Sequence, residues 1–376
     1  METDYSSQSH VALHSEVPFE IRQAVFENRI ADEHADIKRS GEFASKIKHI
    51  AEEYDEKLRK FMGAEKYGQF REYIAEKMRE QAKVLVPPRG PEMSREELNQ
   101  LRVQRKEMGL AFLNKLGIDL KELKALNESA RSRFAKLTFS GSNKDSQSMM
   151  VLPEDVPSSI RSDKLDIVAP AVAWSVFTAP YPGWAWNYSW YVRGFSASYD
   201  RFLNSASGLV GSWTYLTDGD AGDNDAAWVR YNTSVGFWYQ MPTAGLLDVW
   251  IEGQPASDRH YLSLYDEWGW SDSSVEQHNY VTMKATAGST SSGLSLALMS
   301  WFTESGYTDG HWDVSYLTLG SSYWAHLYSD ISFAAGQWVY VEVGNRNWNY
   351  CFANDVSEYS FTDFRWFIKS VYVRPS

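Results

Sequence analysis

Tryptophan divides this chain into two parts of different kinds. All sixteen tryptophans lie between Trp174 and Trp366. Charge divides in the same way, because residues 1–148 hold 26 Lys and Arg against 25 Asp and Glu, out of 37 and 49 in the whole chain. The remaining residues therefore hold 11 basic and 24 acidic side chains. This shift predicts a charged α-helical domain over residues 1–139, a Ser-, Asp- and Pro-rich linker over 140–164, and an acidic, Trp-rich domain over 165–376.

Composition excludes several classes of protein. The net charge of −12 argues against a nucleic-acid-binding protein, and 43% hydrophobic with 23% charged residues is typical of a globular chain. The absence of any run of about 20 apolar residues predicts that there is no transmembrane segment. The polar start predicts no classical secretion signal, which leaves open the cytoplasm, a virion-like particle or export by another route. The single cysteine, Cys351, is expected to be a small buried apolar residue.

The first part has the apolar spacing of amphipathic helices. Apolar residues from Phe43 to Phe61 recur every three or four positions, which predicts a helix with one buried stripe. Ser40 and Gly41 are expected at its start, and a separate earlier helix is expected from about Ser15. The stripes meet either inside one chain, as a bundle or hairpins, or in a seam between copies, as a homo-oligomer. Further helices are expected over 67–78, from the capping box Ser94–Glu97 to Gly117, and over 119–134.

The second part has the pattern of antiparallel strands bounded by turn residues. Val339, Val341 and Val343 alternate with Trp338, Tyr340 and Glu342, which predicts one apolar and one mixed face. The whole chain is therefore predicted to be α+β, with a C-terminal antiparallel β-sandwich of jelly-roll type. Strands are expected over 227–241, 246–252, 259–266, 277–286, 294–302, 311–319, 337–345 and 364–373.

Aromatic clusters beside polar residues are the strongest functional signal. An exposed indole can stack on a sugar ring while neighbouring Asp or Glu accepts hydroxyl hydrogen bonds, and protein interfaces use the same combination. Asp248, Trp250 and Glu252 are expected together on one strand face, with Val249 and Ile251 in the core. Most rings are expected to fill the sandwich core, which still leaves several exposed rings for one binding face. The other candidate ligand-binding residues, at expected turns or strand ends, are Trp184, Trp186, Trp190, Trp268 and Trp270.

The carboxylates of that strand are poor candidates for catalysis. A glycosidase needs two carboxylates, about 5–5.5 Å apart for retention or about 6.5–9.5 Å apart for inversion. Asp248 and Glu252 are four positions apart on an expected strand, so their Cα atoms lie roughly 13 Å apart. No nucleophile elbow, zinc motif or phosphate loop is present, so no catalytic residue is predicted.

The segment 218–225 holds four aspartates in eight residues. Close carboxylates on a loop with glycines can supply several of the oxygens that calcium needs, although the position where an EF-hand has its glutamate is Val229. The alternative interpretation is a solvated acidic turn. Calcium is therefore a candidate cofactor, with Asp218, Asp220, Asp223 and Asp225 as the candidate ligands.

A helical segment followed by a Trp-rich sandwich resembles the architecture of tail-fibre tips, adhesins and some toxins with lectin-like ends, without a shared motif. The resemblance implies a non-catalytic binding or assembly protein, whose helices anchor or oligomerise it and whose sandwich binds a glycan or a protein surface. The alternatives are a carbohydrate-active enzyme on a jelly roll, and a toxin or exported effector whose helices act on membranes. Fold alone does not decide among them.

Overall fold

A computed structural model describes residues 17–85, 95–136, 147–149, 174–181, 183–191, 195–218, 224–266, 272–306, 310–354 and 356–376. The predicted linker over 140–164 lies almost entirely outside these residues. The helices are α1 (Phe19–Met62), α2 (Ala64–Leu85), α3 (Arg95–Leu116) and α4 (Leu120–Lys136). The strands are β1 (Gln147–Met149), β2 (Ser175–Thr178), β3 (Gly183–Tyr191), β4 (Phe195–Asn204), β5 (Leu209–Asp218), β6 (Asn224–Gln240), β7 (Leu247–Asp266), β8 (Asp272–Ala287), β9 (Thr290–Ser291), β10 (Ser295–Gly306), β11 (Gly310–Val314), β12 (Tyr323–Tyr328), β13 (Trp338–Asn354) and β14 (Val356–Pro375).

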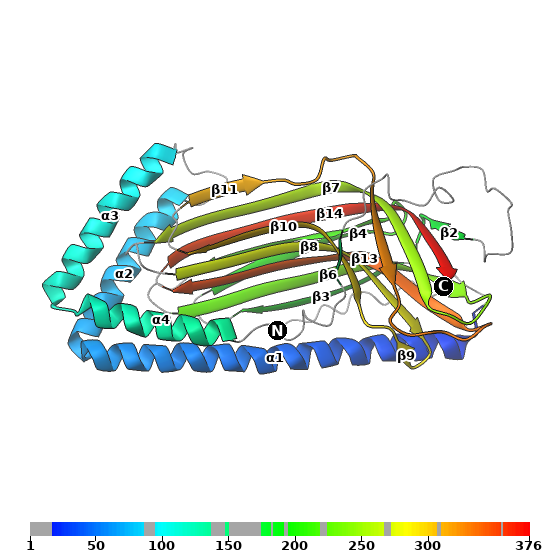
Figure 1. Cartoon of the computed structure of the whole chain (residues 1–376), viewed down its shortest axis with the longest axis horizontal. Helices are drawn as coiled ribbons and strands as arrows, with labels where there is room; N and C mark the ends of the chain where they lie inside the picture. The colour runs from blue at the N-terminus through cyan, green and yellow to red at the C-terminus, as the bar shows by residue number, and fades with distance from the viewer. Residues whose placement is uncertain are drawn as a thin grey trace.

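The strands form two sheets that face each other (Figure 1). Sheet A has the order β1-β10-β8-β13-β6-β3, with β9 beside β8, and sheet B has the order β11-β7-β14-β5-β4, with β12 beside β7 and β2 beside β14. All of these pairs are antiparallel apart from β1 with β10. The predicted α+β class and the antiparallel sandwich are confirmed, while the jelly-roll connectivity and the helical bundle stay predictions.

Alternation along the strands builds the core between the sheets. Val339, Val341 and Val343 of β13 are fully buried and pack in one cluster with Phe364 and Trp366 of β14. The predicted division of residues 338–343 into two faces is thus confirmed. Because long strands alternate over their whole length, each sheet presents a second, outward face that can bind something else.

The strands that build sheet B are longer than the sequence predicts. The expected strands 246–252 and 259–266 are one continuous strand, β7, and the expected turn between them is wrong. The reason is a bulge: the β7–β14 register shifts between Arg365 and Trp366, where Pro255 pairs with Trp366 and Ser257 with Arg365. Pro255 also lies between the residues of β7 that pair with β12 and those that pair with β11, where β14 is the one paired neighbour among the described strands. A bulge at such a position accommodates a proline, which has no amide hydrogen.

A buried polar layer crosses the middle of the sandwich. Gln277 of sheet A donates from Nε2 to the Ser360 hydroxyl of sheet B at 2.8 Å, and that hydroxyl donates to Asn349 Oδ1 at 2.5 Å. Two apolar clusters lie on either side of the layer. Buried polar groups must be paired, so the layer fixes how the two sheets meet. Its fully buried members are Thr214, Thr233, His260, Gln277, Asn279, Asn345, Asn347, Asn349, Ser360 and Thr362.

Helix α1 runs along the sandwich on the β3–β6 side, and α2, α3 and α4 gather at one end (Figure 1). Near its start, Val17 and Val25 pack on Trp238 and Tyr340 of sheet A. At the other end of α1, the helices and the turn between α3 and α4 share an apolar cluster with Trp228 and Trp348. Its buried members from this part of the chain are Ile50, Tyr54, Leu58, Met62, Phe70, Leu113, Ile118, Leu123 and Ala130.

Helix α1 continues through Ser40 and Gly41, so the expected break there is wrong. A Cβ on Gly41 would meet nothing within 4 Å, which places this glycine on an open side of the helix. Glycine in an exposed helix costs only about 1 kcal/mol relative to alanine. That cost does not interrupt a 44-residue helix held against other elements at both ends.

Candidate functional site

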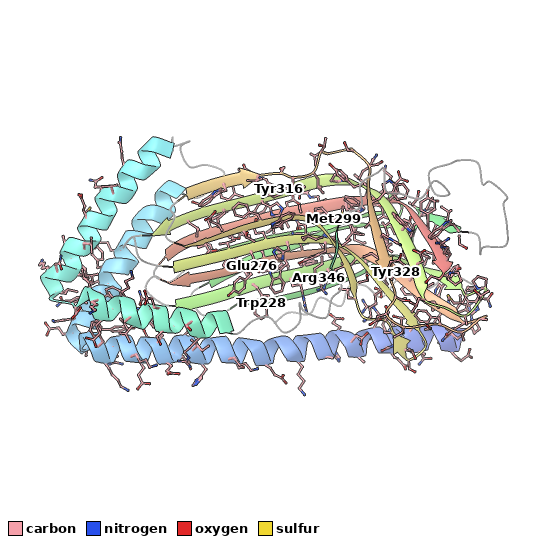
Figure 2. All side chains as sticks on the ribbon, in the orientation of Figure 1. Trp228, Glu276, Met299, Tyr316, Tyr328 and Arg346 are labelled. Atoms are coloured by element: carbon pink, nitrogen blue, oxygen red, sulfur yellow. The ribbon has the colours of Figure 1, made fainter. Side chains whose placement is uncertain are left out.

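Three neighbouring strands of sheet B bring nine residues together on its outer face. The backbone register aligns Tyr328, Asp248 and Arg374 in one row across β12, β7 and β14. The next two rows are His326, Trp250 and Tyr372, then Trp324, Glu252 and Ser370. We call these nine residues the β12–β7–β14 patch. Figure 2 shows Tyr328 toward the end of the sandwich away from α2 and α3.

The predicted trio of Asp248, Trp250 and Glu252 forms the central column of this patch. Val249 and Ile251 between them are fully buried in the sandwich core, as the alternation predicts. The trio differs in its exposure, because Asp248 and Trp250 are buried at 3% and 5% exposed and Glu252 is half-buried. Trp250 is therefore part of the floor of the patch and is not an exposed ring.

Asp248 is the hub of the polar contacts. His326 Nε2 donates to Asp248 Oδ1 at 2.7 Å, and Arg374 Nε donates to Oδ2 at 3.0 Å. This bond assigns the hydrogen of His326 to Nε2 and leaves Nδ1 to accept from the Tyr328 hydroxyl at 3.4 Å. The two bonds that Asp248 accepts hold a histidine and an arginine in fixed positions at the surface.

Aromatic rings also contact His326 and Arg374, the two residues that Asp248 binds. The His326 ring stacks on Trp250, with the centroids 3.9 Å apart and the planes 19° from parallel. The Arg374 guanidinium lies 4.2 Å from the centroid of the Trp174 ring. Stacking of a guanidinium on an indole and its bond to a carboxylate together fix its orientation.

The upper layer of the patch is open to solvent. Tyr328 is 47% exposed, and burial together with the negative charge of Asp248 raises the pKa of its phenol. The phenol therefore stays protonated at neutral pH and can donate a hydrogen bond. The patch as a whole offers a rigid aromatic floor with a phenol, an imidazole, a guanidinium and the Glu252 carboxylate around it, which suits a ligand that has both apolar faces and hydroxyl groups.

The sequence did not indicate the two flanking columns of the patch. In β12, Trp324, His326 and Tyr328 alternate with the buried Ala325 and Leu327, so the same alternation was available there. The sequence does not show which strands are neighbours in the sheet, because β12 and β14 are about 70 and 120 residues away from β7 along the chain.

The other candidate residues lie away from the patch, on β3, at the ends of β5 and β6, or outside the described residues. Trp184, Trp186 and Trp190 belong to strand β3 and not to a turn, and their backbones pair with Ser234, Asn232 and Trp228; their side chains lie outside the described residues. Trp268, Trp270, Asp220 and Asp223 lie outside entirely, and of Asp218 and Asp225 only the backbone is described, at the ends of β5 and β6.

Within the described part of the chain, no group of three or more His, Cys, Asp or Glu side chains could hold a metal ion. The calcium site stays a prediction. Cys351 is fully buried, as expected. None of the described helices combines the length and apolar character needed to span a membrane.

No protein-family model matches this chain, and no curated protein matches it. Among solved structures, an isomalto-dextranase of Arthrobacter globiformis T6 complexed with panose is similar over 43% of this chain and 23% of that one, at 12% identity and a TM-score of 0.18. The carbohydrate-binding module TmCBM61 in complex with β-1,4-galactotriose matches over 44% of this chain and 88% of its own length, at 8% identity and a TM-score of 0.14. A family 29 carbohydrate-binding module complexed with mannohexaose matches over 49% and 94%, at 9% identity and a TM-score of 0.10. At these TM-scores no common fold is shown, so the function has to be argued from the site.

Proposed function

We propose that this chain is a non-catalytic binding protein whose sandwich binds a glycan at the β12–β7–β14 patch, while its helices anchor or oligomerise it. The observation that carries the proposal is the patch itself, in which buried Asp248 and Trp250 position His326, Arg374 and Tyr328 at the surface. Sugar rings have apolar faces that stack on aromatic rings and hydroxyl groups that bond to such polar groups.

The burial and the hydrogen bonds of Asp248 favour a binding role over hydrolysis. Both of its oxygens already accept hydrogen bonds, and the carboxylate is 4% exposed. Glu252 is the other carboxylate of the patch. It lies further along β7 than Asp248, and Trp250 stands between the two on the same face of the strand. A pair of carboxylates flanking one glycosidic bond, as hydrolysis requires, is therefore not formed by these two residues.

Tyr328→Ala tests the proposal. The variant removes the most exposed ring of the patch without touching Asp248, so we expect about tenfold weaker binding, equivalent to about 1.4 kcal/mol. Binding is measured by the emission of the tryptophans on titration with a panel of polysaccharides, with and without calcium. Phe19→Ala, which removes an exposed ring of α1, is the matched control and should bind normally.

Each other outcome has a clear meaning. New reducing ends in the same tubes identify an enzyme, and binding that Tyr328→Ala does not weaken moves the site away from the patch. Binding that needs calcium implicates residues 218–225. No response to any polysaccharide leaves a protein surface as the partner.

A further inference from the structure

Two exposed aromatic rings face solvent at a different place, where the edges of the two sheets meet. Trp301 belongs to β10 of sheet A and is 52% exposed; Tyr316 follows β11 of sheet B and is 50% exposed. Their planes are 7° from parallel and their centroids are 6.2 Å apart. Trp301 is the one exposed residue among the tryptophans whose side chains are described.

One buried carboxylate ties together the two segments that carry these rings. Asp258 is 2% exposed, and its Oδ2 accepts the backbone amides of Tyr316 at 2.8 Å and Leu317 at 2.9 Å. Its Oδ1 accepts the hydroxyl of Ser300 at 2.5 Å, and Ser300 directly precedes Trp301. The distance between the two rings is therefore set by bonds across the two sheets.

A buried histidine supports the same arrangement. His260 is fully buried, with Nε2 3.0 Å from Ser300 Oγ and Nδ1 3.1 Å from Gln277 Oε1. Its ring meets Tyr316 edge to face, with the centroids 5.4 Å apart. Burying a carboxylate and an imidazole is costly unless both are paired, and here their bonds end on the two segments that present the rings. Such prior ordering lowers the entropy that a ligand must lose on binding.

We propose that Trp301 and Tyr316 form a second ligand site, a platform that stacks an uncharged sugar of a glycan chain. The site differs from the β12–β7–β14 patch in every residue, and Figure 2 shows Tyr316 and Tyr328 well apart along the sandwich.

The chemistry of the platform favours an uncharged sugar over other ligands. Asp258 has both oxygens occupied by bonds inside the protein. His278, which lies directly opposite Trp301 in the register, is uncharged at neutral pH because burial lowers its pKa to about 4. A protein partner is a poorer fit, since a stable interface needs roughly 800 Å² on each side and two half-exposed rings supply far less.

Stoichiometry tests the second site. Calorimetric titration with a short neutral oligosaccharide, taken from a polysaccharide that the full chain binds, should give two ligands per wild-type chain. At ligand concentrations where a site weakened about tenfold stays unfilled, Trp301→Ala and Tyr316→Ala should each give one, Tyr328→Ala should also give one, and Trp301→Ala with Tyr328→Ala should give none. The Phe19→Ala control should keep two. All three rings are about half-exposed, so each variant should still unfold in one cooperative thermal transition, which checks folding.

The outcomes separate the two sites. Two ligands per chain in Trp301→Ala and Tyr316→Ala overturn the platform while leaving the patch untouched. One ligand in wild type that Trp301→Ala abolishes and Tyr328→Ala keeps supports the platform and overturns the patch. A charged oligosaccharide that binds at Trp301 when the neutral one does not overturns the assignment of ligand class.

Discussion

Glu358 is a carboxyl group in a place that disfavours its charge. It lies on β14 at 3% exposed, and burial raises its pKa well above the usual value of 4.5. The folded chain therefore keeps a proton at pH values where the unfolded chain has released it. As pH rises above 4.5, the unfolded state is stabilised by ionisation and the folded state is not, so the free energy of unfolding falls until pH reaches the folded pKa.

Glu358→Gln should remove this dependence. At pH 4 the variant should melt close to wild type, and its advantage should grow toward pH 8 by about 1.4 kcal/mol per pH unit until the folded pKa is reached. Thermal unfolding at pH 4, 6 and 8 measures the difference. The exposed Glu107→Gln serves as control and should show no such trend. An advantage that is the same at all three pH values would mean that Glu358 is ionised in the folded chain.

At the scale of the element, α1 is held to sheet A by a buried ion pair. Arg29 Nε lies 2.5 Å from Glu342 Oε2, and both side chains are 3% exposed. Glu342 also accepts from the Ser234 hydroxyl at 3.2 Å. A second ion pair, between Lys284 and Asp32, and a bond from Asn28 to Ser291 at 2.9 Å lie nearby. Polar contacts thus fix the position of the helix along the sheet.

Arg29→Met should loosen this contact, because it leaves Glu342 buried without its partner. Removing one side of a buried pair costs about 3–5 kcal/mol, whereas replacing both with apolar residues is often neutral. We therefore expect Arg29→Met to lower the free energy of denaturant unfolding and to expose the amides of residues 19–32 to hydrogen exchange. Arg29→Met with Glu342→Leu should restore both. Lys60→Ala, which breaks an exposed pair with Glu56, is the control and should change little. A double variant no better than Arg29→Met would show that the charge itself is needed.

Periodicity predicts elements and faces well here, and it predicts pairing poorly. The alternation in β7 placed Asp248, Trp250 and Glu252 on one face correctly, since a strand's side-chain period is a local property. It could not predict Tyr328 and Arg374 beside Asp248, because that depends on which distant strands are neighbours. Two local signals gave wrong predictions. Pro255 indicated a turn, but the strand continues through it with a bulge. Gly41 indicated the start of a helix, but α1 is continuous there because both of its ends pack against other elements.

At the scale of the whole molecule, the helices and the sandwich share apolar surface. Trp228 is fully buried and Trp348 is 8% exposed, in a cluster made largely of helical residues. Their rings are stacked, with the centroids 5.8 Å apart. The two parts of the chain differ in composition, but their apolar side chains pack together in one cluster.

Deleting residues 1–139 should uncover these rings. Because all tryptophans lie in residues 174–366, the emission of the full chain and of the shortened chain comes from the same indoles. We expect emission at longer wavelength, binding of a hydrophobic dye and a lower melting temperature, since large apolar patches become exposed. Unchanged emission and melting would show that the sandwich is stable without the helices.

The position of β14 in sheet B governs when this chain can fold during its synthesis. β14 pairs with β7, β5 and β2, so it is a central strand, yet it is made after all of them. Until residues 356–375 have left the ribosome, β5 and β7 expose unpaired edges. The apolar core also lacks the side chains that β14 contributes to it. The nascent sandwich therefore stays open for most of its translation, which makes it a natural client for chaperones and makes any product that stops before β14 prone to aggregate.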